Sequence, residues 1–244
     1  MRVNFFDTKI DVFTYKETLQ IIIDSIEAKI QLRHTLINTA TLFEMEKDQN
    51  LKNVIESSDL ISVDGMGLIF AYEILNNVKL EKIAGPNIMQ DLIDYCHKNS
   101  KSIFLLGAQQ EVVQNLASRL SNNYSKSLIA GYHNGFFSES DLPTLLKTIQ
   151  NSSPDILFVG MPTPRKEFFL YENQKYLNGI SLLLGVGGCF DLLAGKTKRA
   201  PLWMQNNGLE WLFRLLQEPK RLFMRYLSSN FFLIKKIFLN KVQK

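Results

Sequence analysis

Short apolar runs alternate with amphipathic segments along most of the chain. Runs of five to seven residues predict six buried strands, at 34–38, 59–63, 102–107, 127–131, 155–160 and 181–187. Most of these runs end in glycine or a small polar residue. Their apolar positions are continuous rather than alternating, which is typical of strands that are covered on both faces.

Amphipathic segments between the runs predict helices. In residues 14–28, Thr14 and Glu17 form a capping box ahead of the apolar positions Leu19, Ile22 and Ile26. Alternation of strand and helix predicts an α/β fold, a Rossmann-like, mostly parallel sheet with helices on both faces. In such a sheet, ligands bind beyond the carboxyl ends of the strands.

The residues that follow each strand are therefore site candidates. They are Asn38 and Thr39 after the first run, Asp64 and Gly65 after the second, Gly107 after the third, 160–167 after the fifth, and 187–191 after the sixth. Asp64 has two interpretations. Asp-Gly is a common turn dipeptide, but a carboxylate beside small residues at a strand end is also suited to act as a general base.

Two further segments have phosphate- or nucleotide-binding chemistry. In "GMPTPRKEFF", Pro164, Arg165, Lys166 and Glu167 open a helix, and basic residues at a helix N-terminus suit a phosphate. The alternative is a well-capped helix with solvated charges. In "GVGGCFDLLAG", Gly187 and Asp191 suit a backbone approach to a nucleotide and contact with its ribose, and structural packing is the alternative.

His133 lies between aromatic residues and glycines in "GYHNGFF". It is a substrate-binding candidate, although a lone histidine is more often a structural hydrogen-bonding residue. The two cysteines, Cys96 and Cys189, are far apart and suggest neither a zinc site nor a disulfide framework, so a reducing, cytoplasmic compartment is expected. We also expect no metal and no cofactor.

The sequence changes character after Asp191 and becomes aromatic and basic. Residues 211–244 hold eight of the 28 lysines and arginines against one acid, Glu218, a local net charge of +7. The first 210 residues carry 20 bases and 23 acids, a net charge of −3. We therefore expect a catalytic domain at 1–197 and a helical C-terminal appendage at 198–244.

Residues 211–244 of the appendage interleave their bases with seven aromatic residues. These are Trp211, Phe213, Phe223, Tyr226, Phe231, Phe232 and Phe238. Such a composition suits anionic lipid headgroups, nucleic-acid phosphates or an oligomer interface. Because Leu, Ile and Phe dominate its uncharged positions, a membrane surface is favoured over nucleic acid.

The contact with a membrane is expected to be peripheral. The most apolar stretch, "YLSSNFFLIKKIFL", is interrupted by Lys235 and Lys236, and the N-terminus has no apolar core long enough for a secretory signal. An appendage that both completes a site and binds lipid also predicts a homo-oligomer in solution that dissociates at the membrane.

Together these segments resemble one family of enzymes. The order of Asn38, "DLISVDGMGL", "FLLG", "YHNGFF", "DILFVGMPTPRKE" and the long block from "LLGVGGCFDLLAGKTKRAPLWM" to "GLEWLFRLLQEPKRLFMRYL" resembles the WecG/TagA/CpsF glycosyltransferases of bacteria. The resemblance runs from about residue 7 to 230. Its last block is the most specific part.

The resemblance implies an inverting, metal-independent transferase. It would move an N-acetylmannosamine-type sugar from a UDP donor to an undecaprenyl-diphosphate-linked acceptor on the inner leaflet, during teichoic acid, capsule or exopolysaccharide synthesis. It implies Asp64 as catalytic base and Asn38 as the residue that orients the substrate. Arg214 and Arg221 are the implied ligands of the acceptor diphosphate.

Several positions depart from the family pattern. Lys166 replaces a glutamine, Leu36 a threonine, Lys82 an arginine and Asn87 an aspartate. We expect Lys166 to contact the donor phosphate and Lys82 to remain a substrate-binding residue. Two other interpretations stay open: a nucleotide- or nucleic-acid-binding module without catalysis and, ranked last because GxGxxG is absent, a dinucleotide-dependent oxidoreductase.

Overall fold

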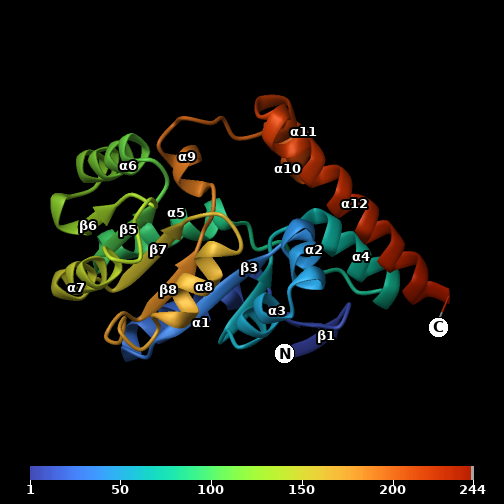
Figure 1. Ribbon diagram of the computed structural model, residues 1–244, viewed down its shortest axis with the longest axis horizontal. Coiled ribbons are helices and arrows are strands. Elements are labelled where there is room, and N and C mark those ends of the chain that lie inside the picture. The colour runs from blue at the N-terminus through green and yellow to red at the C-terminus, as the bar shows by residue number, and fades with distance from the viewer. Residues whose placement is uncertain (243–244) are drawn as a thin grey trace.

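A six-stranded parallel sheet forms the centre of the protein (Figure 1). The computed structural model describes residues 1–242, except the side chains of Asn206 and Val242. The strand order is β4 (Leu60–Val63), β3 (Leu32–Ile37), β8 (Leu182–Gly185), β7 (Ile156–Gly160), β5 (Ile103–Gly107) and β6 (Ile129–His133). Each strand overlaps one of the six predicted runs, so the predicted α/β fold is confirmed.

Helices cover both faces of the sheet. One face packs against α1 (Tyr15–Ala28), α5 (Gly85–Lys98), α6 (Gln110–Asn123) and the short α9 (Cys189–Leu193) in a single apolar cluster. The other face packs against α2 (Thr39–Lys47), α3 (Gln49–Glu56) and α4 (Met66–Asn76) beside β4, and against α7 (Leu142–Ser152) and α8 (Arg165–Glu172) beside β7. A 3₁₀ turn, η1 (Lys126–Leu128), precedes β6. In α1 the predicted capping box of Thr14 and Glu17 is present.

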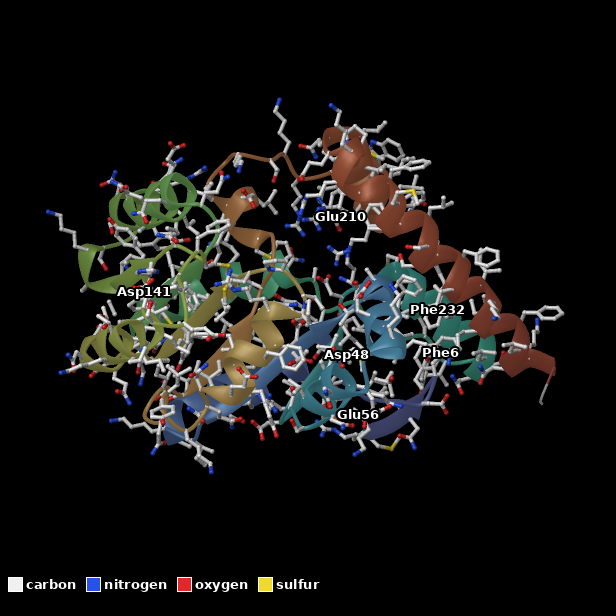
Figure 2. The ribbon with its side chains drawn as sticks, in the orientation of Figure 1. Phe6, Asp48, Glu56, Asp141, Glu210 and Phe232 are labelled. Atoms are coloured by element: carbon white, nitrogen blue, oxygen red, sulfur yellow. The ribbon has the colours of Figure 1, made fainter. Side chains whose placement is uncertain are left out.

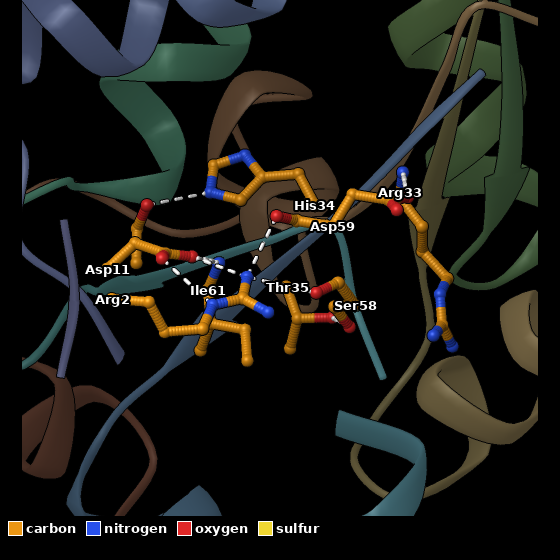
Figure 3. Close-up of polar contacts among 9 residues, drawn as sticks. Arg2, Asp11, Arg33, His34, Thr35, Ser58, Asp59 and Ile61 are labelled. Atoms are coloured by element: carbon orange, nitrogen blue, oxygen red, sulfur yellow. Dashed lines mark hydrogen bonds and ion pairs between the residues drawn. The ribbon is translucent and has the colours of Figure 1, made fainter. Parts of the chain in front are cut away.

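An antiparallel hairpin that the apolar pattern did not predict precedes α1. It comprises β1 (Arg2–Phe5) and β2 (Thr8–Asp11), and it lies along β4, the edge strand of the sheet. Asp11 accepts a hydrogen bond from the Ile61 N–H at 2.8 Å and pairs with Arg2, which donates to the Asp59 carbonyl (Figure 3). The hairpin thereby satisfies backbone groups of an edge strand that would otherwise be open to pairing with another chain.

Three helices follow the sheet, α10 (Leu202–Asn206), α11 (Glu210–Gln217) and α12 (Pro219–Val242). The long helix α12 runs past α2 and α4 (Figure 1). Leu222, Ser229 and Leu233 are buried on its inner side, and the Phe232 ring packs against Phe43 of α2 with ring centroids 5.4 Å apart (Figure 2). Within residues 1–242, no helix has both the length and the hydropathy needed to span a bilayer.

The helices that leave β3 and β8 lie on opposite faces of the sheet. After β3 the chain enters α2, whereas after the adjacent β8 it enters α9 on the other face. Such a divergence defines a topological switch point at the carboxyl ends of the two strands, and open parallel sheets usually bind their ligands in the crevice at such a point. Asn38 follows β3 at this point, and residues 187–191 follow β8.

Candidate active site

Asp64 lies at the carboxyl end of β4, next to the β3 end that carries Asn38. Its backbone N–H donates to the Ile37 carbonyl at 2.9 Å, which extends the pairing of β4 with β3 by one residue. A Cβ added to Gly65 would lie 3.0 Å from the Asn38 Cβ. The glycine therefore allows the Asp64 turn to pack directly against Asn38, as the turn interpretation of this dipeptide requires.

Part of the surroundings of Asp64 is apolar. A Cβ placed on Gly85, the first residue of α5, would lie 3.2 Å from Leu36 Cδ1, 3.3 Å from Cys189 Sγ and 3.5 Å from Asp64 Oδ2. Burial against this wall raises the pKa of Asp64 to about 6. A carboxyl group that titrates near neutral pH matches the requirement for a general base.

Three charged side chains and one backbone group also act on Asp64. Lys82, the Gly85 N–H and Arg214 lower the pKa of Asp64, while Glu210 raises it. Glu210 lies on α11 and pairs with Lys82 through Oε2 and Nζ at 2.7 Å, so the C-terminal helices are tied to the body beside the carboxylate (Figure 2). Arg214 Nη2 lies 3.1 Å from the position of a Cβ on Gly188. Lys82 and Arg214, two of the predicted substrate-binding residues, thus lie close enough to Asp64 to act on its pKa.

Asn38 caps helix α2. Its Oδ1 accepts hydrogen bonds from the N–H groups of Ala40 and Thr41, at 3.0 and 3.1 Å. Thr39 is buried beside it, and a Cβ on Gly67 would meet Thr39 Oγ1 at 2.7 Å and Leu233 Cδ2 of α12 at 3.1 Å. The strand end is consequently held between the body and the C-terminal helix.

Lys166 and Glu167 are buried, which neither interpretation of this helix start anticipated. They form an ion pair, and the Lys166 ammonium also donates to Thr163 Oγ1. A cavity of about 10 Å³, bounded by Arg33, Thr35, Lys166, Glu167 and Gly185 among others, adjoins the pair. In this arrangement Lys166 neutralises Glu167 and positions the 161–164 loop. Direct contact with a donor phosphate would require its ammonium to leave Glu167.

The remaining candidates of the helix start and the neighbouring strands lie farther along the carboxyl edge. Pro164 precedes α8 with a cis peptide bond, and the exposed Arg165 stacks its guanidinium on the Phe137 ring at 4.7 Å. His133 ends β6, at the opposite edge of the sheet from β4. Five inter-strand spacings of about 4.8 Å separate these two strands, so His133 lies roughly 24 Å from Asp64.

Two glycine positions at this edge have a positive φ. Gly107 has φ +146° and packs against Gly160, where an added Cβ would lie 2.5 Å from backbone atoms. Gly187, with φ +54°, turns the chain from β8 into α9. Both conformations favour glycine, which gives each residue a structural role beside any contact with substrate.

Asp191 of α9 pairs with Lys196 at 3.2 Å, and Lys196 also donates to Gln109 before α6. Arg221 is different from the other candidates because it lies on α12 and pairs with Glu218 of the preceding turn, with 60% of its side chain exposed. No contact described for Arg221 reaches Asp64, although Arg221, Arg214 and Glu210 all act electrostatically on the Tyr226 hydroxyl.

Two further residues near Asp64 were not predicted as site residues. Glu210 and Arg199 both act electrostatically on the Cys189 thiol, as do Asp64 and Arg214, and burial raises the pKa of that thiol to about 12. Arg199 belongs to the "RAP" segment of the most specific sequence block. The sequence therefore contained it as a motif residue, but only the structure shows where it lies. Within residues 1–242, no group of three or more His, Cys, Asp or Glu side chains is placed to hold a metal ion.

A carboxyl group of raised pKa at the carboxyl ends of a parallel sheet, with Lys82 and Arg214 close enough to act on that pKa, is the arrangement expected of an α/β enzyme. A family model described as "Glycosyl transferase WecG/TagA/CpsF family" matches residues 3–244. The chain belongs to this family and is a glycosyltransferase.

Two relatives from Bacillus carry the same name, "N-acetylglucosaminyldiphosphoundecaprenol N-acetyl-beta-D-mannosaminyltransferase". The protein of Bacillus subtilis (strain 168) is 34% identical over 196 residues, covering 80% of this chain and 75% of the relative. That of Bacillus spizizenii (strain ATCC 23059 / NRRL B-14472 / W23) is 31% identical over 179 residues, covering 73% and 68%.

Proposed function

We propose that this glycosyltransferase transfers an N-acetylmannosamine-type hexose from a UDP-sugar to a sugar linked to undecaprenyl diphosphate, with inversion and without a metal ion. The names of the two Bacillus relatives support the acceptor and the sugar type. The single observation that carries the mechanism is Asp64, a half-buried carboxylate of raised pKa beside Asn38 at the crevice of the sheet.

In the proposed reaction, Asp64 removes the proton from the acceptor hydroxyl as its oxygen attacks the anomeric carbon of the donor. The bond between that carbon and the UDP oxygen breaks, and UDP leaves with the electron pair. One base and a stabilised leaving group suffice for such an inverting displacement. Asn38 orients the hydroxyl through its amide, whose Oδ1 is already fixed by the α2 cap.

Charge on the two diphosphates requires positive groups nearby. Arg214 lies beside Asp64 and Gly188. The first N–H groups of α5 are already used, because Gly85 donates to Asp64, Pro86 has no N–H, and Asn87 donates to the Ala84 carbonyl. Guanidinium groups stabilise phosphate oxygens. We assign the nucleotide to the β8–β7–β5 part of the carboxyl edge, where Asp191 and Gly187 are available to it.

The outer face of α12 supports a peripheral position on the inner face of the cell membrane. Phe223, Leu227, Phe231, Ile234 and Phe238 recur every three or four residues on this face and are between 55% and 71% exposed. Exposed bases flank them, among them Lys220 and Lys235. An apolar stripe with basic flanks is the pattern of a helix that lies in the interface of an anionic bilayer.

In this proposal residues 1–197 form the catalytic domain and 198–244 the membrane-associating appendage. The appendage completes the site through Glu210 and Arg214, so the lipid-linked acceptor meets Asp64 only at the membrane surface. Surface-polysaccharide or teichoic acid synthesis is the pathway class that uses such an acceptor. A homo-oligomer in solution would bury the apolar stripe until the membrane replaces it.

A donor screen tests the reaction. UDP release is measured from UDP-N-acetylmannosamine, UDP-N-acetylglucosamine and UDP-glucose, with a synthetic polyprenyl-diphosphate-linked N-acetylglucosamine as acceptor and EDTA in one arm. We expect turnover with the first donor, unchanged by EDTA, and its loss by about 10³-fold in Asp64→Asn. Asp24→Asn, an exposed α1 carboxylate, is the control. Full turnover by Asp64→Asn would exclude Asp64 as the base.

Vesicle sedimentation tests the membrane proposal. The double variant Phe231→Ser/Phe238→Ser is expected to bind vesicles containing anionic lipid at least about tenfold more weakly, because two large side chains no longer insert. Tyr176→Ser removes an aromatic ring of the body that is 62% exposed and serves as the control. Equal binding of the double variant and the wild type would rule out this face of α12.

A further inference from the structure

Arg199 lies in the loop between α9 and α10, and its guanidinium reaches the start of α5. Its Nη2 donates to Asn87 Oδ1 at 2.5 Å, and Asn87 belongs to the first turn of that helix. A carboxylate in this position would both orient and neutralise the guanidinium. The neutral amide of Asn87 orients it and leaves its charge uncompensated.

The rest of the Arg199 guanidinium has unused donor capacity. Its Nε is buried and has no hydrogen-bond partner among the residues that the structure describes, and none of the ion pairs within 1–242 includes Arg199. Arginine stays protonated in proteins, so the group cannot escape this cost by losing a proton. A buried charged donor without a partner is unfavourable. The terminal nitrogens of Arg199 lie at an exposed hydrogen bond with Asn87, so an anionic ligand would reach the guanidinium there and offset part of this cost.

Arg199 faces the same neighbourhood as Asp64. The Cys189 thiol is within electrostatic range of Asp64, Arg199 and Arg214. Arg214, like Arg199, takes part in no ion pair among the described residues. Two guanidinium groups outside any described ion pair therefore lie in this region, with Arg214 close enough to lower the pKa of Asp64 and Arg199 at the first turn of α5. This set of donors is suited to an anion with several oxygens, such as a diphosphate.

We propose that Arg199, oriented by Asn87, is a substrate-binding residue that donates to the diphosphate of the donor or of the acceptor. Asn87 is a positioning residue that acts through Arg199. The inference rests on the proposed function only for the source of the diphosphate. Whether a diphosphate binds Arg199 does not depend on whether Asp64 is the base.

Binding to the full-length protein tests the proposal with three probes, namely inorganic pyrophosphate, UDP and farnesyl diphosphate. Arg199→Gln is expected to weaken at least one of them by about 10- to 100-fold, the effect of losing a hydrogen bond to a charged group. Selective loss of UDP binding assigns Arg199 to the donor, and selective loss of farnesyl diphosphate assigns it to the acceptor. Lys198→Gln removes an exposed charge from the same loop and should change affinity by about twofold or less.

Asn87→Asp separates a ligand role from a structural one. If Arg199 only joined the loop to α5, the new ion pair between Arg199 and the aspartate introduced at position 87 would keep or raise the melting temperature. Diphosphate binding would then be unchanged. A ligand role predicts the same melting temperature but weaker binding, because the added carboxylate neutralises the guanidinium. Arg199→Lys should recover part of the affinity lost in Arg199→Gln.

The proposal is overturned if the three probes bind Arg199→Gln and Asn87→Asp no more weakly than they bind the wild type. Asp64→Asn should keep diphosphate binding while it loses turnover. The same titrations on that variant therefore distinguish an error in the assignment of the base from an error in the assignment of Arg199.

Discussion

Replacing Asp64 by asparagine should make the folded protein more stable. Burial raises the pKa of Asp64 to about 6 from an ordinary value of 3.8. At neutral pH the carboxylate is ionised in both the folded and the unfolded chain, and the difference of about two units corresponds to about 3 kcal/mol at 1.36 kcal/mol per unit. Asparagine has nearly the same shape and no charge, so Asp64→Asn avoids most of this cost.

The gain in stability of Asp64→Asn over the wild type should increase with pH. The folded state binds the Asp64 proton more tightly than the unfolded state, so the destabilisation is absent below about pH 4, grows between pH 4 and 6, and is constant above pH 6. At 2–4 °C per kcal/mol for a chain of this size, Asp64→Asn should melt about 6 °C or more above the wild type at pH 7.5. The two curves should converge near pH 4.

Thermal unfolding followed by circular dichroism from pH 4 to 8 measures this difference. The exposed Asp24→Asn variant controls for the removal of one negative charge and should melt with the wild type. The argument that burial destabilises the carboxylate would be refuted if Asp64→Asn melted below the wild type at pH 7.5. It would also be refuted if the difference between the two melting temperatures did not change with pH. Loss of activity together with a gain in stability is the expected exchange at a functional site.

Further predictions concern the surroundings of Asp64 and the sheet edge. Below pH 7, kcat/KM should fall as Asp64 protonates. Lys82→Ala should move this fall in kcat/KM to higher pH, and Glu210→Ala should move it to lower pH, because the two residues act on the pKa of Asp64 with opposite sign. A shift in the same direction for both variants would contradict the assigned contacts. Leu36→Thr, which puts a hydroxyl donor beside the carboxylate, should lower the same apparent pKa by about one unit in pH–rate profiles, and an unchanged profile would mean that the hydroxyl does not reach it. Gly107→Ala should reduce the free energy of unfolding by about 1–3 kcal/mol in urea titrations, because its φ of +146° and the 2.5 Å approach to Gly160 exclude a Cβ; a neutral effect would show that this approach relaxes freely.

Much of the fold follows from local pattern. Most of the six sheet strands are apolar runs followed by glycine or a small polar residue, and α1 carries its own capping box, so neither requires knowledge of distant contacts. The hairpin of β1 and β2 is different. Its strands are only four residues long and its stabilising contacts, Arg2 with Asp11 and Asp11 with Ile61, depend on an edge strand 50 positions away in the sequence.

The sequence also placed Asp64 and Asn38 at strand ends, because parallel strands bring their carboxyl ends to one edge. It could not order the strands along that edge. The observed order puts β4 beside β3 and β6 at the opposite side, so Asp64 and Asn38 meet while His133 lies far from both. Strand order depends on which faces the connecting helices cover, and that is decided by packing across the whole domain.

By itself, the sequence determined the α/β class, the family and the residue types available for catalysis, since these depend on local pattern and on an extended series of motifs. Only the tertiary structure decided which charges act together. It buried Lys166 against Glu167, paired Arg221 with Glu218, tied Lys82 to Glu210, and left the buried Arg199 Nε without a hydrogen-bond partner among the described residues. The energy of a charged group depends on the distance and burial of its neighbours, and neither quantity exists before the chain folds.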